Sequence, residues 1–383
     1  MNEASLQEDD NKVSYMKLEL PKNLIEKIPG AEAFAGFLRK IQGPPKEPAS
    51  EISLACDFGA SKIVFLETER SGGKFLLSKF QKLHRIDDKK KDSEILRQAF
   101  EAGNYRTNKV RISVKGQGVI LRFIQFPKMK PEELRGAISY EVEQYIPFKA
   151  ADVVWDIHVL DDNVPLAAGG MGMNILLAVL KREDLNKTLE IFQGAGLQVE
   201  IIDCDALASI NAVEHFSPQK FLESCAVLDI GTEISTLSVV VGGKPRFIRD
   251  ISYGGVDMVK KLKRKLGLTN EQALEQIEVD RQPSPEAQEI IKQALVDLVS
   301  ELKLSVNYYL DQVAGAEPIK NFFICGGGGY HPLVLETLTR DLGASAEMLD
   351  ILKGVELAPG LSPEVIKSNQ GLLPVSIGLC LRD

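Results

Sequence analysis

Two short segments of the sequence carry residue types that bind phosphate and divalent cations. Each has an acidic residue, a glycine two positions later, and a small hydroxylated residue close behind. Glycine has no Cβ, so the backbone N–H groups of such a turn can approach phosphate oxygens closely. The acidic residue can hold Mg²⁺ through water, because this ion sheds its hydration shell reluctantly. The candidate nucleotide-binding residues are Asp57, Gly59, Ala60, Ser61 and Lys62 in the first segment and Asp229, Gly231, Thr232 and Glu233 in the second, with Asp57 and Asp229 as candidate metal ligands.

Each segment stands between two apolar, strand-like runs, which predicts a β-hairpin with the glycine at its tip. The first hairpin covers 52–67 and the second covers 226–241. The recurrence of the same hairpin pattern at this separation in the sequence indicates two related lobes. Two such tips facing each other would clamp a polyphosphate.

Two further groups of glycines are candidates for the same site. Gly254 and Gly255 precede a predicted helix, and Gly326 to Gly329 follow a short apolar strand at 321–325. The glycine run permits two interpretations, a tight turn from strand to helix or close passage of the backbone beneath an adenosine. The candidate residues from these groups are Gly254, Gly255, Gly326, Gly327 and Gly328.

The region between the hairpins, 118–202, has its own order of predicted elements. Strands are expected at 119–126, 153–160, 174–180 and 198–202, and helices at 131–145 and 183–193. The order βαββαβ describes a small α+β domain inserted in the first lobe. The predicted division is an appendage with a Pro-rich linker at 1–50, a first lobe at 51–117, the insert at 118–202, a second lobe with the nucleotide cleft at 203–360, and a C-terminal segment at 361–383 that returns to the first lobe.

Composition excludes several classes of protein. The chain has 383 residues, of which 44% are hydrophobic, so it can bury a large core in more than one domain. A formal net charge of -8 repels a polyanion, which argues against nucleic acid as a ligand. The sequence predicts neither a membrane span nor a signal peptide, and its five cysteines follow no ligand spacing and are expected as buried thiols in a reducing cytosol.

Several segments resemble the PilM family of type IV pilus assembly proteins. The stretch 138–148, ISYEVEQYIPF, resembles a characteristic PilM segment, and 153–160 resembles the strand that follows it there. The passages 195–208, 247–255 and 301–309 are similar to further PilM motifs. The resemblance covers about residues 52–383.

The resemblance implies an α/β, actin-like (ribonuclease H-like) fold with two lobes and an inserted βαββαβ domain. It further implies ATP, with Mg²⁺, in the cleft and a cytoplasmic scaffold held at the inner membrane by the short tail of a PilN-like protein. Pilus assembly ATPases and self-association are further partners to consider. The residues that the resemblance assigns are Ser305 for the nucleotide and Tyr145, Ile146, Pro147 and Phe148 for the partner.

Three departures from the family bear on the nucleotide. The first loop is two residues tighter between Asp57 and Lys62 than in the resembled proteins. Ala273, Leu274 and Ile277 stand where the family has adenosine contacts, and Leu304 stands where it usually has an arginine. ATP binding and an empty, degenerate cleft are therefore both open, and the expected activity is at most that of a weak ATPase, with Asp205 or Glu233 as candidate catalytic acids.

Three other functions share this architecture. A sugar kinase would need a catalytic aspartate in the insert, where no such motif is found. An FtsA-like filament protein would be expected to end in an amphipathic membrane helix, and a GspL-like secretion protein to continue into a membrane span. The prediction is therefore a pilus assembly scaffold, with these three as alternatives.

Overall fold

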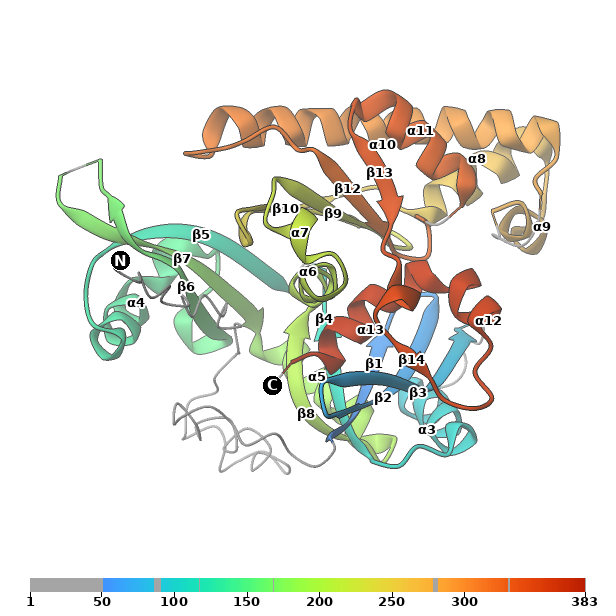
Figure 1. Ribbon diagram of the computed structural model, residues 1–383, viewed down its shortest axis with the longest axis horizontal. Helices are drawn as coiled ribbons and strands as arrows, with labels where there is room; N and C mark the ends of the chain where they lie inside the picture. Colours follow the sequence, from blue (N-terminus) through green and yellow to red (C-terminus); the bar gives the residue numbers. More distant parts are fainter. Residues whose placement is uncertain are drawn as a thin grey trace, which may run out of the picture.

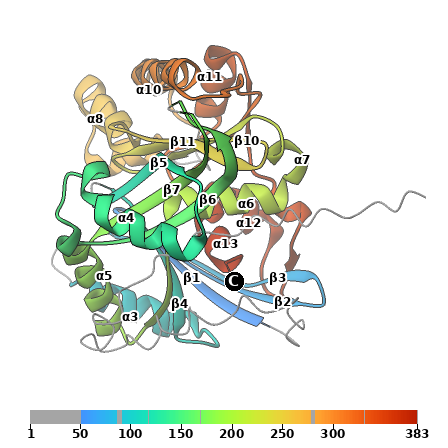
Figure 2. The ribbon, with the colours of Figure 1, turned by 90° about the vertical axis from the view of Figure 1, so that its left-hand side faces the viewer.

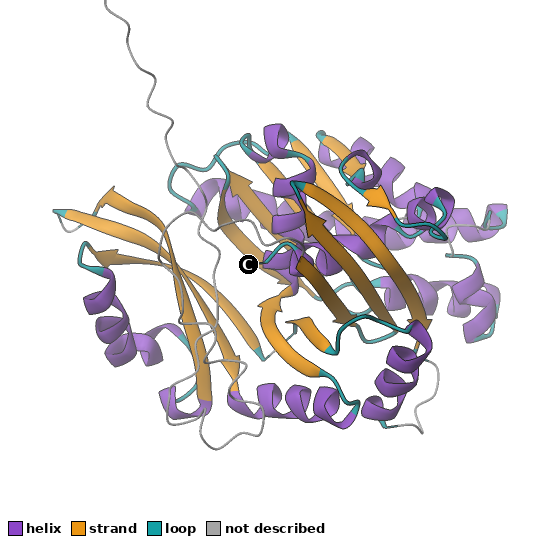
Figure 3. Cartoon of the chain, turned by 60° about the horizontal axis from the view of Figure 1, so that its bottom comes forward, coloured by secondary structure: helices purple, strands orange, loops and turns teal. Residues whose placement is uncertain are grey.

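The computed structural model describes residues 51–85, 91–116, 118–167, 169–277, 282–329 and 331–382. The appendage and linker predicted for residues 1–50 lie outside the described residues. The described part of the chain has two lobes, each built on its own sheet, and a smaller third sheet that projects from one end of the molecule (Figures 1 and 3).

Six strands form the sheet of the first lobe, namely β1 (Glu51–Phe58), β2 (Lys62–Ser71), β3 (Lys74–His84), β4 (Lys109–Val114), β8 (Gln198–Cys204) and β14 (Glu356–Leu357). Their order is β14-β3-β2-β1-β4-β8. β1 and β2 pair antiparallel, which confirms the first predicted hairpin. β4 runs parallel to both β1 and β8, so the C-terminal ends of these three strands meet at one edge of the sheet. Helices α3 (Asp92–Gly103) and α5 (Arg182–Gly194) pack against each other beside this sheet.

Five strands form the sheet of the second lobe, namely β9 (Cys225–Ile230), β10 (Ser235–Val241), β11 (Lys244–Ile251), β12 (Asn321–Cys325) and β13 (Ser345–Met348). Their order is β11-β10-β9-β12-β13. β9 and β10 pair antiparallel, which confirms the second predicted hairpin. Four helices accompany this sheet, namely α8 (Gly255–Leu266), α9 (Asn270–Glu275), α10 (Pro285–Gln312) and α11 (Pro332–Leu342).

The long helix α10 lies on the outside of the second lobe (Figure 1). It begins where the Ser284 hydroxyl accepts a hydrogen bond from the Ala287 N–H, with Pro285 in the first turn. The predicted apolar stripe, which includes Leu295 and Leu302, is buried against the sheet. Helical spacing in the sequence therefore predicts which face of α10 belongs to the core.

The insert consists of three strands and one helix, namely β5 (Val119–Pro127), α4 (Pro131–Tyr145), β6 (Val153–Pro165) and β7 (Met171–Lys181). The strand order is β5-β7-β6, with β5 and β6 at the two edges. α4 packs on this sheet through Leu134, Ile138 and Val142 (Figure 2).

The last two elements of the predicted βαββαβ unit belong to the first lobe. The order of elements is as predicted, but β8 pairs with β4, and α5 packs on α3 through residues such as Leu185 and Phe192. The prediction of a four-stranded insert reaching residue 202 is therefore wrong, because the insert has three strands and its last strand is β7. The apolar pattern of a strand predicts the strand but does not specify which sheet edge it joins.

Two buried helices meet at the centre of the molecule. α6 (Asp205–Phe216) and α13 (Leu373–Cys380) cross in close contact, and α13 also lies against β1 and β2 as predicted for the C-terminal segment (Figure 1). A Cβ on Gly378 would lie 1.7 Å from the carbonyl oxygen of Ala208, so only glycine permits this crossing.

The remaining elements are short, namely η2 (Ala150–Asp152), α7 (Pro218–Phe221), η3 (Ile351–Lys353), α12 (Pro363–Ser368) and η4 (Gln370–Leu372). All five cysteines are free and buried, which confirms the prediction of buried thiols. In the part of the chain that the structure describes, no helix combines the length and apolar character that a bilayer span requires.

Candidate functional site

The two predicted hairpin tips share one backbone geometry. The Gly59 N–H donates to the Lys62 carbonyl at 2.9 Å, and the Gly231 N–H donates to the Ile234 carbonyl at 3.1 Å. A Cβ on Gly59 or Gly231 would lie 2.9 or 2.6 Å from the same carbonyl oxygen. Glycine is therefore required at both tips because the backbone closes too tightly for a side chain, and the internal repeat extends to this detail.

The two tips face each other across the cleft between the lobes. The Ser61 Oγ and the Thr232 Oγ1 lie 2.7 Å apart and form a hydrogen bond between residues 171 positions apart in the sequence. Each tip therefore presents a hydroxyl group and backbone N–H groups to the same narrow space.

The glycine run after β12 packs against the second tip. Gly326 has a φ of +86°, and a Cβ there would lie 2.1 Å from the Asp229 Oδ1. The Gly328 N–H donates to the Ile230 carbonyl at 2.8 Å, and the Gly255 N–H donates to the Gly231 carbonyl at 2.9 Å. These contacts support the interpretation of the run as a tight turn in which backbone packs on backbone.

A cavity of about 200 Å³ lies between the two tips. Most of the predicted nucleotide-binding residues line it, namely Asp57, Gly59, Ala60, Ser61, Lys62, Asp229, Gly231, Thr232, Glu233, Gly326 and Gly327. Gly254, Gly255 and Gly328 do not line it. Ser305 is fully buried on α10, and its hydroxyl donates to the Glu301 carbonyl at 2.7 Å, so the structure does not bring it to the cavity.

The sequence analysis missed several residues of the cavity wall, namely Val64, Lys115, Gly116, Ile234, Thr236, Gly371, Leu372 and Val375. Lys115 follows β4, and its Nζ lies 2.8 Å from the Oδ2 of Asp205, which follows β8. Because β1, β4 and β8 are parallel, their ends bring Asp57, Lys115 and Asp205 to one sheet edge. The sequence signal that could have pointed to Lys115 is its position, because it is a polar residue directly after an apolar strand.

Burial and mutual repulsion raise the pKa values of two carboxyl groups in the cleft. Burial raises the pKa of Asp57 to about 7, and the charges of Asp205 and Asp229 add to this rise while Lys115 opposes it. Burial, together with Asp205 and Asp250, raises the pKa of Asp229 to about 6, again against Lys115. These acids therefore gain from any cation brought into the cleft.

The donor set of the cleft fits a cation that arrives with phosphate. Among the described residues, no group of three or more His, Cys, Asp or Glu side chains could hold a metal ion. Mg²⁺ in phosphate sites is commonly held by one or two carboxylates together with substrate oxygens and water. Asp57 and Asp229 line the cavity and could supply those carboxylates.

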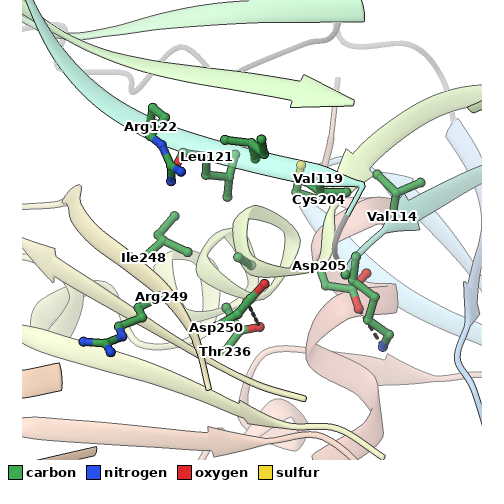
Figure 4. Close-up of a pocket in the computed structure, with 14 residues that line it drawn as sticks. Val114, Val119, Leu121, Arg122, Cys204, Asp205, Thr236, Ile248, Arg249 and Asp250 are labelled. Carbon is green, nitrogen blue, oxygen red and sulfur yellow. Dashed lines mark hydrogen bonds and ion pairs between the residues drawn. The ribbon is translucent and has the colours of Figure 1, made fainter. Parts of the chain in front are cut away.

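A second cavity, of about 270 Å³, lies beside the insert. Figure 4 shows Leu121 and Arg122 of β5 on one side of it and Ile248 and Arg249 of β11 on the other, with Asp205 at one end. β5 is an edge strand of the insert, and β11 is an edge strand of the second lobe. Two edge strands therefore flank one groove, which we call the β5–β11 groove.

A family model described as type IV pilus assembly protein PilM matches residues 56–383. The chain belongs to the PilM family. It is 25% identical to a chain of the solved structure "PilM-PilN type IV pilus biogenesis complex", with 88% of this chain and 99% of that one covered and a TM-score of 0.76. The ethanolamine utilization protein EutJ from Carboxydothermus hydrogenoformans is 14% identical over 91% of this chain and 94% of its own, with a TM-score of 0.51. The predicted actin-like, two-lobed α/β fold is confirmed.

In this PilM-family protein an ion-pair cluster fastens the insert to the second lobe. The Asp161 carboxylate of β6 lies 2.9 Å from the Lys244 Nζ of β11 and also pairs with Arg246. Burial alone would raise the pKa of Asp161, but hydrogen bonds from Arg246, Asn174 and Lys244 hold it well below its usual range. The cluster stabilises the position of β6 relative to β11, and thereby the geometry of the β5–β11 groove.

We expect Asp161→Asn to lower the free energy of unfolding by about 1 kcal/mol at neutral pH. A carboxylate with a depressed pKa stabilises the fold above its unfolded pKa of about 4, and the stabilisation is lost as the pH falls below that value. Urea denaturation should therefore show a smaller difference between variant and wild type in acid than at neutral pH. Asp162→Asn, on the exposed neighbouring residue, is the control. An equal difference at both pH values would show that the charge is not the source.

The predicted partner-binding residues of this PilM-family protein lie apart from the β5–β11 groove. Ile146 is buried in the core of the insert, and Tyr145 and Phe148 pack against that core. Pro147 and Phe148 line another cavity, of about 660 Å³, where the Lys181 Nζ lies 4.3 Å from the centre of the Phe148 ring. We call this surface the α4 corner. It is a second place where a partner could bind.

Proposed function

We propose that this protein is a scaffold of type IV pilus assembly that binds the cytoplasmic tail of a PilN-like membrane protein in the β5–β11 groove. The observation that carries the proposal is that two edge strands flank this one groove. Membership of the PilM family supports the process, and the solved PilM–PilN complex supports the kind of partner. The protein would then work in the cytoplasm, held at the inner membrane through this partner.

The walls of the groove suit an extended peptide. Edge strands carry backbone N–H and C=O groups with which a peptide can form hydrogen bonds, and pockets between them can take alternate side chains. Val119, Leu121 and Ile248 provide apolar surface, while Arg122 and Arg249 provide charge. A few apolar anchors together with backbone hydrogen bonds would hold the tail.

We expect Leu121→Asp to weaken binding of the tail by about thirtyfold or more, because a buried anchor is often worth at least about 2 kcal/mol. The measurement is a titration of the full chain with a labelled peptide that carries the tail of the PilN-like protein. Gln125→Asp is the matched control, since Gln125 is exposed on the same strand and does not line the groove.

The α4 corner provides the competing outcome. Its segment carries the strongest resemblance to the PilM family, and Phe148 lines a cavity of its own. If Phe148→Ala abolishes binding while Leu121→Asp leaves it unchanged, the tail binds at the corner and the groove proposal is wrong. Circular dichroism must show that each variant stays folded.

The cleft supports a second part of the proposal, which is weak binding of ATP with Mg²⁺. The two hairpin tips, Lys62 and Lys115 converge on one cavity that could hold phosphate groups. When bound, Mg²⁺ would neutralise phosphate charge beside Asp57 and Asp229. Of the two candidate catalytic acids, Asp205 forms an ion pair with Lys115, so Glu233, which lines the cavity, is the better candidate. We therefore propose turnover too slow for a metabolic enzyme.

We expect Asp229→Ala to abolish binding of ATP with Mg²⁺. The carboxylate is buried at the tip of the second hairpin and lines the cavity. Isothermal titration calorimetry of the full chain measures the loss, with Asp162→Ala as a control on an exposed acid of the insert. Equal affinity of wild type and Asp229→Ala would remove Asp229 from the site, and absence of binding by the wild type would favour the degenerate cleft.

A further inference from the structure

The cleft cavity is small and enclosed by groups that suit phosphate. Its volume of about 200 Å³ lies below the range of roughly 300–1,000 Å³ typical of pockets that enclose drug-sized ligands. Its walls come from the two hairpin tips, the glycine run, the residues after β4 and the segment around η4. Among the described residues, none of the side chains that line it is aromatic. The cavity therefore has room for a few phosphate groups, and its described lining offers no aromatic ring on which a base could stack.

Close contacts set the size of the cavity on two sides. On one side, the hydrogen bond of 2.7 Å between Ser61 and Thr232 joins the two hairpin tips. On the other side, the Gly326 N–H donates to the Gly371 carbonyl at 2.8 Å. There the Leu372 Cδ2 lies 3.5 Å from the position that a Cβ on Gly327 would take. These contacts join the walls on both sides and limit the width of the space between them.

The polar groups in the cavity are those that bind phosphate oxygens. Lys62 reaches the glycine run, where its Nζ lies 3.1 Å from the Cβ position of Gly327. Lys115, which follows β4, lines the same cavity, as do Ser61 and Thr232 with their hydrogen-bonded hydroxyls. Ammonium and hydroxyl donors recognise the charge and oxygens of phosphate, and neither distinguishes one base from another.

Positions at which the resembled family has adenosine contacts carry other residues in this chain. Ala273 is fully buried in the core of the second lobe. Ser305 is buried with its hydroxyl bonded within α10, and Leu304 is 59% exposed on the same helix. Ala273, Leu304 and Ser305 do not line the cavity, so they contact no group held inside it.

We propose that the cleft recognises a chain of phosphate groups and does not select the base or the sugar attached to it. This inference rests on the proposed nucleotide site, because it specifies which part of the ligand that site binds. Inorganic tripolyphosphate and the triphosphates of any nucleoside are then equivalent ligands, each with Mg²⁺.

Calorimetry of the full chain with ATP, GTP, CTP, inorganic tripolyphosphate and AMP tests this. We expect the four triphosphates to bind within about fivefold of one another and AMP to bind at least about tenfold more weakly. Lys115→Met should weaken all four triphosphates by the same factor, whereas Lys109→Met, on an exposed lysine at the other end of β4, should leave them unchanged.

The outcomes separate this inference from the proposed site. If ATP binds about tenfold or more tightly than GTP and tripolyphosphate, the base is recognised and this inference is wrong while the nucleotide site stands. If none of the five ligands binds to the folded wild-type chain, both the inference and the nucleotide site are overturned. The comparison among ligands uses the wild-type protein, so it does not depend on whether a variant folds.

Discussion

Gly378→Ala should strongly destabilise the native state. The new Cβ would lie 1.7 Å from the carbonyl oxygen of Ala208 and 2.4 Å from its carbonyl carbon, both in the backbone of α6. Backbone atoms cannot rotate away as a flexible side chain does, so α6 and α13 must separate. Overpacking of this kind in a core costs about 3 kcal/mol or more, which is a large part of the stability of a typical domain. Thermal unfolding monitored by circular dichroism measures the loss.

Gly136→Ala is the matched control for this prediction. Gly136 also lies within a helix, α4, but a Cβ there would meet no atom within 4 Å. Alanine in a helix interior is favoured over glycine by about 0.5–1 kcal/mol, so this variant should be slightly more stable than the wild type. A Gly378→Ala protein as stable as the wild type would show that α6 and α13 do not cross as described.

The crossing of α6 and α13 matters for function because it positions both cavities. Asp205 is the first residue of α6 and lies at one end of the β5–β11 groove. Gly371 and Leu372 precede α13 and form part of the wall of the cleft cavity. A change at Gly378 should therefore disturb sites that its side chain never touches.

Asp203→Ala should lower the free energy of unfolding by about 3–5 kcal/mol, because it takes away the carboxylate that pairs with a buried guanidinium. The Arg382 Nε donates to the Asp203 Oδ2 at 2.6 Å, and both side chains are only 2% exposed. The pair holds the C-terminal segment against β8. Urea denaturation of the full chain measures the change.

A double variant shows whether the ion pair itself is the cause. Asp203→Leu combined with Arg382→Met replaces both charges with apolar groups and should be more stable than Asp203→Ala. Glu356→Ala, which breaks an exposed ion pair with Lys74, should change stability little. A double variant less stable than the single one would show that neighbouring groups need the Arg382 guanidinium for their own contacts.

Local patterns in the sequence predicted the parts of the site that local geometry determines. Gly59 and Gly231 close turns through hydrogen bonds to residues three positions away, so residue type and spacing are sufficient to find them. The stripe of α10 was likewise predictable, because helical periodicity directly reflects the face that is buried.

Features that depend on distant parts of the chain were not predictable in this way. The sequence pattern of β8 predicts a strand, but only the fold shows that this strand pairs with β4. The β5–β11 groove and the wall formed by Gly371 join segments far apart in the sequence. Ser305 lies within a passage that matches a family motif, but its hydroxyl donates a hydrogen bond to the Glu301 carbonyl one turn earlier in α10. A motif alone cannot reveal this contact.

The most direct test of the central claim is hydrogen exchange of the full chain with and without the tail of a PilN-like protein. Edge strands that gain a peptide partner exchange their outward backbone amides more slowly. We predict that the tail slows exchange at residues 119–122 of β5 and 248–250 of β11, which flank the groove. Slowed exchange confined to residues 145–148 at the α4 corner, with both strands unchanged, would contradict the proposed groove.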